Sequence, residues 1–193
     1  MGRVRARLCS RNAHKARELE RLLPGWTIEP LDAEDFPPET GESYYENARA
    51  KARLGREVGD WDAWMIGEDS GLEVAALDGR PGLHSARYAP EGAPAIRKLL
   101  GELEGVEDRR ARYLSELVAL APGGEEFRGT GTLEGRIAHE PRGSEGFGYD
   151  PIFVPDGEEQ TVAELGNEWK AENSHRARAG RALRAAVEVA DTA

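Results

Sequence analysis

The residues best suited to chemistry lie in the segment GEDSGLEV, residues 67–74. Two adjacent carboxylates, Glu68 and Asp69, follow the apolar run 63–66 and precede a serine and a glycine. Open α/β sheets bind ligands at the ends of their strands, and Mg²⁺ is commonly held by one or two carboxylates together with substrate phosphates. An acidic turn, in which Asp69 bonds the local backbone, explains the same residues equally well.

A second segment, SRNAHK at residues 10–15, has residue types suited to binding an anion. It follows an alternating strand pattern over residues 4–8 and leads into a helix. The free N–H groups at a helix N-terminus bind anions, and Lys15 adds a positive charge. The glycines of a Walker A loop are absent. A simple helix cap by Ser10 or Asn12 is the alternative.

The segment ETGESYYENARAKA, residues 39–52, places an acid and a lysine near the start of a predicted helix. The sequence SYYE at 43–46 predicts a capping box. Glu39 precedes the helix, while Asn47 and Lys51 are four residues apart and share one face. Ordinary polarity of a helix surface is the alternative for this pair.

Two later segments could contact a nucleoside. In GFGYDPIF, residues 146–153, Phe147 or Tyr149 could stack on a base, although a buried aromatic turn has the same pattern. In KAENSHRARA, a histidine and an arginine fall in the first turn of a predicted helix. None of the four histidines has a partner at the spacing of a helical zinc site.

Length and composition limit the classes of protein to which this chain can belong. The chain has 193 residues, which suits one domain or two closely joined lobes. A net charge of −10 argues against general nucleic-acid binding. The single cysteine, Cys9, favours a reducing compartment, and no stretch is apolar enough to span a membrane. We therefore expect a cytoplasmic protein without nucleic-acid or membrane partners.

Strand and helix patterns mix without strict alternation, which predicts a mixed α/β sheet rather than a purely parallel one. Helices are expected around residues 19–23, over 43–58, around 96–103 and from 174 onward. Strands are expected over residues 4–8, 26–31, 63–68, 72–77, 111–121 and 125–134.

Taken in order, the segments SRNAHK, ETGESYYENARAKA, EDSGLEVAALDGRPGLHSARYA, GFGYDPIF and KAENSHRARA resemble the inosine triphosphate pyrophosphatase family. The resemblance extends over about residues 4–187. It implies a single catalytic domain, residues 1–193, in which an elongated mixed sheet with flanking helices forms two lobes around a central cleft. It also implies a homodimer that uses Mg²⁺ to hydrolyse ITP, dITP and XTP to the monophosphate and pyrophosphate.

The resemblance also assigns roles to residues. Glu39 and Asp69 would hold the metal, and Asp69 would be the catalytic proton acceptor. Phosphate and substrate contacts would come from Ser10, Arg11, Asn12, Ala13, His14, Lys15, Lys51 and Ser70. The nucleoside would meet Phe147, Gly148, Tyr149, Asp150, Lys170, His175 and Arg176.

The resemblance is incomplete at two positions. Many family members have aspartate where this chain has Glu68, and glycine or lysine where it has Arg11. Two mechanisms stay open: Asp69 orients the attacking water, or Glu68 takes its proton. Two other functions also stay open, a related pyrophosphatase for modified pyrimidine nucleotides and a nucleotide-sensing or RNA-binding module without turnover.

Overall fold

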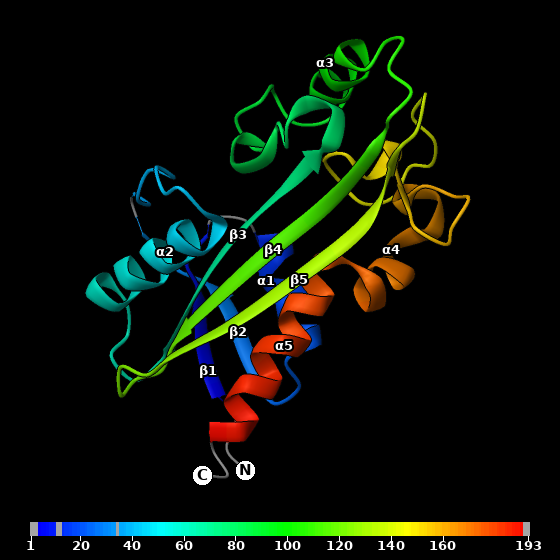
Figure 1. Cartoon of the computed structure of the whole chain (residues 1–193). Coiled ribbons are helices and arrows are strands. Elements are labelled where there is room, and N and C mark those ends of the chain that lie inside the picture. The colour runs from blue at the N-terminus through cyan, green and yellow to red at the C-terminus, as the bar shows by residue number, and fades with distance from the viewer. Residues whose placement is uncertain (1–3, 11–12, 34, 191–193) are drawn as a thin grey trace. The chain divides into compact units, whose positions relative to one another are not determined.

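The structure, a computed structural model, describes residues 4–10, 13–33 and 35–190 (Figure 1). The strands are β1 (Val4–Leu8), β2 (Trp26–Pro30), β3 (Trp64–Val74), β4 (Arg110–Leu120), β5 (Glu126–Ile137) and β6 (Phe153–Pro155). The helices are α1 (Ala13–Leu22), α2 (Tyr44–Val58), α3 (Ala93–Glu102), α4 (Val162–Asn173) and α5 (His175–Ala190).

All six strands belong to one sheet, in the order β2-β1-β3-β4-β5-β6. Strand β1 runs parallel to both β2 and β3, whereas β6 runs antiparallel to β5. The sheet is therefore mixed, with helices alongside it, and the predicted fold class is confirmed.

The chain forms two compact units. Unit 1 comprises Met1–Asp69, Ser115–Gly131 and His175–Ala193, and unit 2 comprises Ser70–Leu114 and Thr132–Ser174. Strands β3, β4 and β5 each contribute residues to both units. Helices α1, α2 and α5 belong to unit 1, and α3 and α4 belong to unit 2.

Unit 1 has three layers, a sheet with helices on both of its faces. Neighbouring residues of its strands pack into two different hydrophobic cores. In β3, Ile66 packs with residues of α1 and α5, whereas Met65 packs with residues of α2. In β4, Leu117 and Val118 divide between the two cores in the same way. Successive side chains of a strand point to opposite faces. Helices α1 and α5 therefore cover one face of this part of the sheet, and α2 covers the other.

Two glycines allow the helices of unit 1 to lie very close to the strands. A Cβ atom at Gly67 of β3 would stand 1.8 Å from the carbonyl oxygen of Ala48 in α2. A Cβ atom at Gly131 of β5 would stand 2.0 Å from the carbonyl oxygen of His175 in α5. These approaches fix the height of α2 and α5 above the sheet, and therefore the reach of their side chains.

Unit 2 has a core of its own, built on the parts of β3, β4 and β5 that belong to it. Leu72, Leu99 and Phe153 are each completely buried in this core. Tyr113 of β4 and Phe153 of β6 pack with their ring centroids 4.7 Å apart. Such aromatic pairs stabilise a core beyond the area that they bury.

The structure differs from the sequence-based expectations at three elements. Residues 63–68 and 72–77, expected as two strands, form the single strand β3 through Val74, so the paired acids lie inside a strand. Ser43 caps α2 as expected, but the Glu46 carboxylate accepts from the N–H of Glu42, which leaves the capping box incomplete. Helix α4 was not expected.

We predict that Gly67→Ala separates α2 from β3 and destabilises the protein by about 1–3 kcal/mol, the usual cost of overpacking. The neighbouring atom is a backbone oxygen, which cannot rotate away. The free energy of unfolding from urea titrations measures the effect. Gly101→Ala is the matched control, because Gly101 is a helical residue with nothing within 4 Å of an added Cβ atom. Equal stability of the two variants would contradict the close packing.

Among the described residues, no helix is long and apolar enough to cross a membrane.

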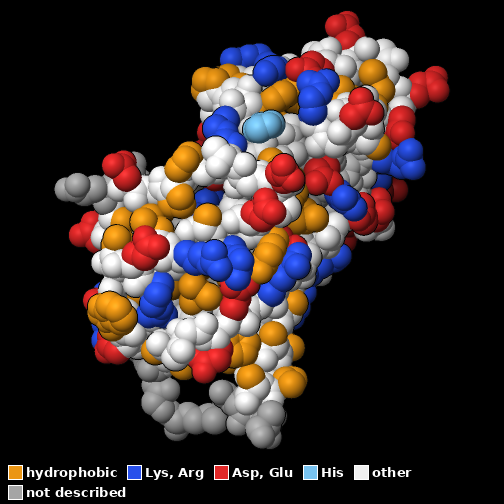
Figure 2. Space-filling view, turned by 60° about the vertical axis from the view of Figure 1, so that its left-hand side comes forward, with side chains coloured by type: hydrophobic (Ala, Val, Ile, Leu, Met, Phe, Trp, Pro, Cys, Tyr) orange, Lys and Arg blue, Asp and Glu red, His pale blue; other side chains and the backbone are white. Residues whose placement is uncertain are grey.

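On the face drawn in Figure 2, Lys and Arg side chains are interspersed with Asp and Glu side chains.

Candidate active site

The adjacent acids Glu68 and Asp69 point to opposite faces of the sheet, because they are neighbours within β3. Asp69 contacts side chains of α2, whereas Glu68 contacts side chains of α1 and α5. Both carboxylates are nearly inaccessible, with relative exposures of 5% for Asp69 and 1% for Glu68. The pair therefore forms two separate polar clusters in unit 1 rather than one two-carboxylate site.

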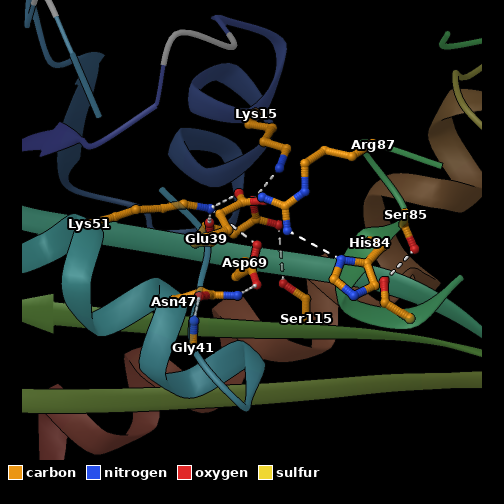
Figure 3. Close-up of polar contacts among 12 residues, drawn as sticks. Lys15, Glu39, Gly41, Asn47, Lys51, Asp69, His84, Ser85, Arg87 and Ser115 are labelled. Atoms are coloured by element: carbon orange, nitrogen blue, oxygen red, sulfur yellow. Dashed lines mark hydrogen bonds and ion pairs between the residues drawn. The ribbon is translucent and has the colours of Figure 1, made fainter. Parts of the chain in front are cut away.

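On the α2 face, Asp69 shares a lysine with Glu39 (Figure 3). The Lys51 ammonium donates to Glu39 Oε1 at 2.5 Å, to Asp69 Oδ1 at 3.1 Å and to the Glu68 carbonyl oxygen at 3.1 Å. The amide of Asn47 donates to the other oxygen of Asp69, Oδ2, at 2.9 Å. The structure thus brings together the two predicted metal ligands and the predicted phosphate lysine.

This cluster, the Asp69 cluster, contains two carboxylates for one ammonium. Burial raises the pKa of Asp69, against the opposing effects of Lys51 and Asn47. Burial lowers the pKa of Lys51, but Asp69 and Glu39 outweigh it and raise that pKa overall. Lys51 therefore stays protonated, and a surplus of negative charge remains beside it.

A divalent cation suits this surplus. Glu39 and Asp69 both contact one positive group, Lys51 Nζ, so two carboxylates face a single ammonium. The described residues contain no cluster of three or more His, Cys, Asp or Glu able to hold a metal. Mg²⁺ does not require one, because it often uses one or two carboxylates and completes its shell with water and substrate phosphates. Glu39 and Asp69 are therefore the candidates in this cluster to hold a divalent cation.

On the opposite face, Glu68 is surrounded by cationic and polar side chains of unit 1. Lys15 Nζ donates to Oε2 at 2.5 Å, and Arg176 donates to Oε1 from Nε at 3.2 Å and from its second amino group at 3.0 Å. Ser115 donates to the same Oε1 at 3.4 Å, and Glu18 accepts from Arg176 at 2.6 Å. Burial raises the pKa of Glu68, but Lys15 and Arg176 outweigh it and hold the pKa well below its usual range.

The geometry of Glu68 gives it a role different from that of Asp69. Both of its oxygens are occupied by donors, and its charge is matched by Lys15 and Arg176. Glu68 therefore acts as a buried counter-ion that holds Lys15 of α1 and Arg176 of α5 at the same strand.

The predicted phosphate-binding segment lies only partly within the described residues. Arg11 and Asn12 fall outside them. Ser10 directly follows β1, and Ala13 and His14 begin α1. Ser70, the other predicted substrate contact, is half-buried in β3.

In unit 2, the predicted nucleoside platform is assembled around Asp150. Its Oδ2 accepts from the Lys170 ammonium at 2.7 Å and from the Phe147 N–H at 2.8 Å. The Lys170 ammonium also lies 3.7 Å from the centroid of the Phe147 ring. Phe147 is 36% exposed, which is unusual for a large aromatic side chain in this chain. An exposed ring beside a buried lysine–aspartate pair is suited to stacking on a base and bonding its edge.

Glycines shape this platform and explain the Gly-rich sequence around it. Gly146 and Gly148 have φ values of +77° and +63°. A Cβ atom at Gly146 would stand 2.2 Å from Asp150 Oδ2, so a larger residue would displace the carboxylate. Tyr149 is buried, and its hydroxyl lies 3.5 Å from the carbonyl oxygen of Ser85.

The residues expected to form one base pocket are divided between the units. Lys170 belongs to unit 2 with Phe147 and Asp150, whereas His175 and Arg176 begin α5 in unit 1. Their assignment to a common pocket stays a prediction.

Three residues in these clusters had no role predicted from the sequence: Asn47, Ser115 and Glu18. The spacing of Asn47 and Lys51 was a usable signal, and the alternative of ordinary surface polarity is wrong because Asn47 is 3% exposed. Ser115 and Glu18 gave no signal beyond their positions on a strand and a helix.

The fold and these clusters define a class of protein: a mixed α/β protein in which buried acids are paired with lysines and an arginine. Comparison with known proteins gives the family. The family model described as the Ham1 family matches residues 6–186. The chain therefore belongs to the Ham1 family, and the resemblance inferred from the five segments is confirmed.

Individual relatives agree with this assignment. The dITP/XTP pyrophosphatase of Deinococcus deserti is 43% identical over 179 residues, which cover 91% of this chain and 85% of the relative. The dITP/XTP pyrophosphatase of Deinococcus radiodurans is 44% identical over 181 residues, covering 91% and 88%. The structure of the Staphylococcus aureus Ham1 protein is similar with a TM-score of 0.84 at 35% identity, covering 96% of this chain and 99% of that one.

Proposed function

We propose that this protein hydrolyses the non-standard purine nucleoside triphosphates ITP, dITP and XTP to the monophosphate and pyrophosphate, and so cleanses the nucleotide pool. The observation that carries the proposal is the match, over most of the chain, to relatives named dITP/XTP pyrophosphatase. The Asp69 cluster supports it, because an acid–lysine cluster that fits Mg²⁺ is what hydrolysis of a triphosphate requires.

Glu39 and Asp69 would hold Mg²⁺, which when bound supplies Lewis-acid stabilisation of the phosphate oxygens. Lys51, fixed between these acids, would place a positive charge beside the phosphates. Lys15 and the segment 10–15 would bind the triphosphate and stabilise the departing pyrophosphate.

Asp69 is the better proton acceptor of the two acids in β3. Both oxygens of Glu68 are already paired with cationic groups, and Lys15 and Arg176, opposing the effect of burial, keep its pKa well below the usual range. Asp69 instead shares its one ammonium, Lys51, with Glu39, so negative charge remains available beside the attacking water. Asp69 would therefore orient the water that attacks the α-phosphorus and, as the resemblance implies, accept its proton, and Glu68 would keep the neighbouring cations in place.

Selection of the base would depend on the platform in unit 2, where Lys170 contacts both Asp150 and the Phe147 ring. Inosine and xanthine carry a 6-oxo group, which accepts hydrogen bonds, where adenine carries an amine, which donates them. Lys170 is a donor beside the Phe147 ring. A site built on such bonds can reject the mismatched base by about 10⁴-fold, because its buried polar groups are then left unpaired.

We further propose that the protein is a homodimer and acts in the cytoplasm, as the resemblance to its family implies. Light scattering after gel filtration would test the first point: an apparent mass twice that of the 21.1 kDa chain is expected. A mass equal to that of one chain would contradict it.

A substrate panel tests the proposed function against its two alternatives. With Mg²⁺, pyrophosphate release from ITP and XTP should greatly exceed release from GTP, ATP and dUTP. Preference for dUTP would favour a pyrimidine pyrophosphatase, and binding without release would favour a nucleotide-binding module. Either result would overturn the proposal.

A further inference from the structure

The side chain of Asn47 connects the two chain segments that carry Glu39 and Asp69 (Figure 3). Its Nδ2 donates to Asp69 Oδ2 at 2.9 Å, and its Oδ1 accepts from the Gly41 N–H at 2.8 Å. Gly41 is two residues after Glu39 in the loop before α2. One amide therefore ties the loop of the first acid to the carboxylate of the second.

The surroundings of Asn47 allow little freedom. The residue is 3% exposed, so its polar atoms depend on protein partners. The orientation of its amide follows from those partners: the carboxylate requires a donor and the Gly41 N–H requires an acceptor. A Cβ atom at Gly41 would stand 2.7 Å from Asn47 Oδ1, so the loop approaches as closely as glycine permits.

Asn47 and Lys51 divide the two oxygens of Asp69 between them. Lys51 bonds Oδ1 and brings a positive charge, whereas Asn47 bonds Oδ2 and brings none. A neutral donor fixes the rotation of the carboxylate without neutralising it. Asp69 therefore keeps the negative charge that a cation needs, while its carboxylate is held in one orientation.

We propose that Asn47 is a positioning residue that orients Asp69 and the Glu39 loop for a divalent cation. The inference rests on the proposed function only in naming Mg²⁺-dependent hydrolysis as the purpose of this orientation. Removing a partner that orients a metal ligand typically lowers metal affinity or activity by about 10–100-fold.

The test compares cation binding in three proteins, using Mn²⁺ as a paramagnetic substitute for Mg²⁺. Asn47→Leu has nearly the same shape and removes both hydrogen bonds. Ser43→Ala removes the cap of the same helix, where Ser43 accepts from the Glu46 N–H, but touches neither acid. Free Mn²⁺ is measured by electron paramagnetic resonance without nucleotide, and the melting temperature is recorded for each protein.

We expect about 10–100-fold weaker Mn²⁺ binding for Asn47→Leu and unchanged binding for Ser43→Ala, although both variants lower the melting temperature. Turnover of ITP should likewise be reduced in Asn47→Leu and unchanged in Ser43→Ala. In Asn47→Leu, kcat should fall by a larger factor than KM changes, and kcat should partly recover at high Mg²⁺. Should Asn47→Leu fail to fold, Asn47→Ala, which removes the same bonds with a smaller side chain, takes its place.

Binding of Mn²⁺ by Asn47→Leu within twofold of the wild type would overturn the inference, as would a wild type that binds no Mn²⁺. A wild type that binds Mn²⁺ but does not hydrolyse ITP would overturn the proposed function instead, and the comparison of Asn47→Leu with Ser43→Ala would still decide the role of Asn47.

Discussion

Replacing Asp69 with asparagine will reduce turnover of ITP by about 10³-fold, within the range reported for loss of a general base, while the protein stays folded. Asparagine has nearly the same shape and can still bond Asn47 or Lys51, but it carries no charge for a cation and cannot accept a proton. Lys51 keeps Glu39 as a partner at 2.5 Å, so no buried ammonium is left without a carboxylate. The value of kcat/KM for ITP measures the loss, and thermal unfolding checks the fold.

Asp62→Asn is the control for Asp69→Asn. Asp62 pairs with Arg5 at 3.1 Å, and its side chain is 75% exposed, so its removal should leave both rate and stability almost unchanged. Near-wild-type turnover by Asp69→Asn would show that the metal and base assignments are wrong.

Replacing Glu68 with glutamine will mainly destabilise the protein, by about 3–5 kcal/mol, the usual cost of removing one partner from a buried ion pair. Arg176 is 2% exposed and would lose its ionised partner in β3. Glu18 remains beside it, which favours the lower end of this range. The free energy of unfolding from urea titrations at neutral pH measures the effect.

The effect of Glu68 depends on pH in a defined direction. The pKa of Glu68 in the folded protein lies well below its usual range, because Lys15 and Arg176 outweigh the effect of burial, so the ionised carboxylate stabilises the fold above its unfolded pKa of about 4.3. That contribution is lost as the pH falls toward the folded pKa. The difference in stability between wild type and Glu68→Gln should therefore narrow progressively below about pH 4.

Glu188→Gln is the control for Glu68→Gln. Glu188 pairs with Arg184 one helical turn away on the surface, and such pairs contribute about 0.3–0.5 kcal/mol. Equal stability of the two variants would refute the counter-ion role of Glu68. If Glu68→Gln instead lost more turnover than Asp69→Asn without loss of stability, the proton acceptor would have to be Glu68.

The sequence predicted strands β1, β2, β4 and β5, most of the helices and the acid–lysine segments, but not the relation between the two acids. The first expected strand ended at Glu68, and Ser70 and Gly71 fell between it and a second expected strand. In the structure, β3 continues through both residues. Gly67 lies inside the strand and admits the backbone of α2 at Ala48, a contact between residues far apart in the chain. Only the continuation of β3 shows that adjacent acids face opposite sides.

Helix α4 was missed for a local reason. Gly166 has φ +86° inside it, so the periodic pattern is interrupted by a kink. A signal was nevertheless present: Thr161 and Glu164 form a complete capping box, in which each side chain accepts from the other residue's backbone N–H. The predicted nucleoside platform gave a clearer signal, because the Gly-Phe-Gly-Tyr-Asp sequence specifies both the turn and the residues in it.

Turnover of ITP in ¹⁸O-labelled water tests the central claim most directly. Attack of water on the α-phosphorus predicts that pyrophosphate is the released product, that the label appears in the inosine monophosphate, and that ATP under the same conditions reacts far more slowly. Orthophosphate as the first product, label in the pyrophosphate, or equal rates for ITP and ATP would contradict the proposed function.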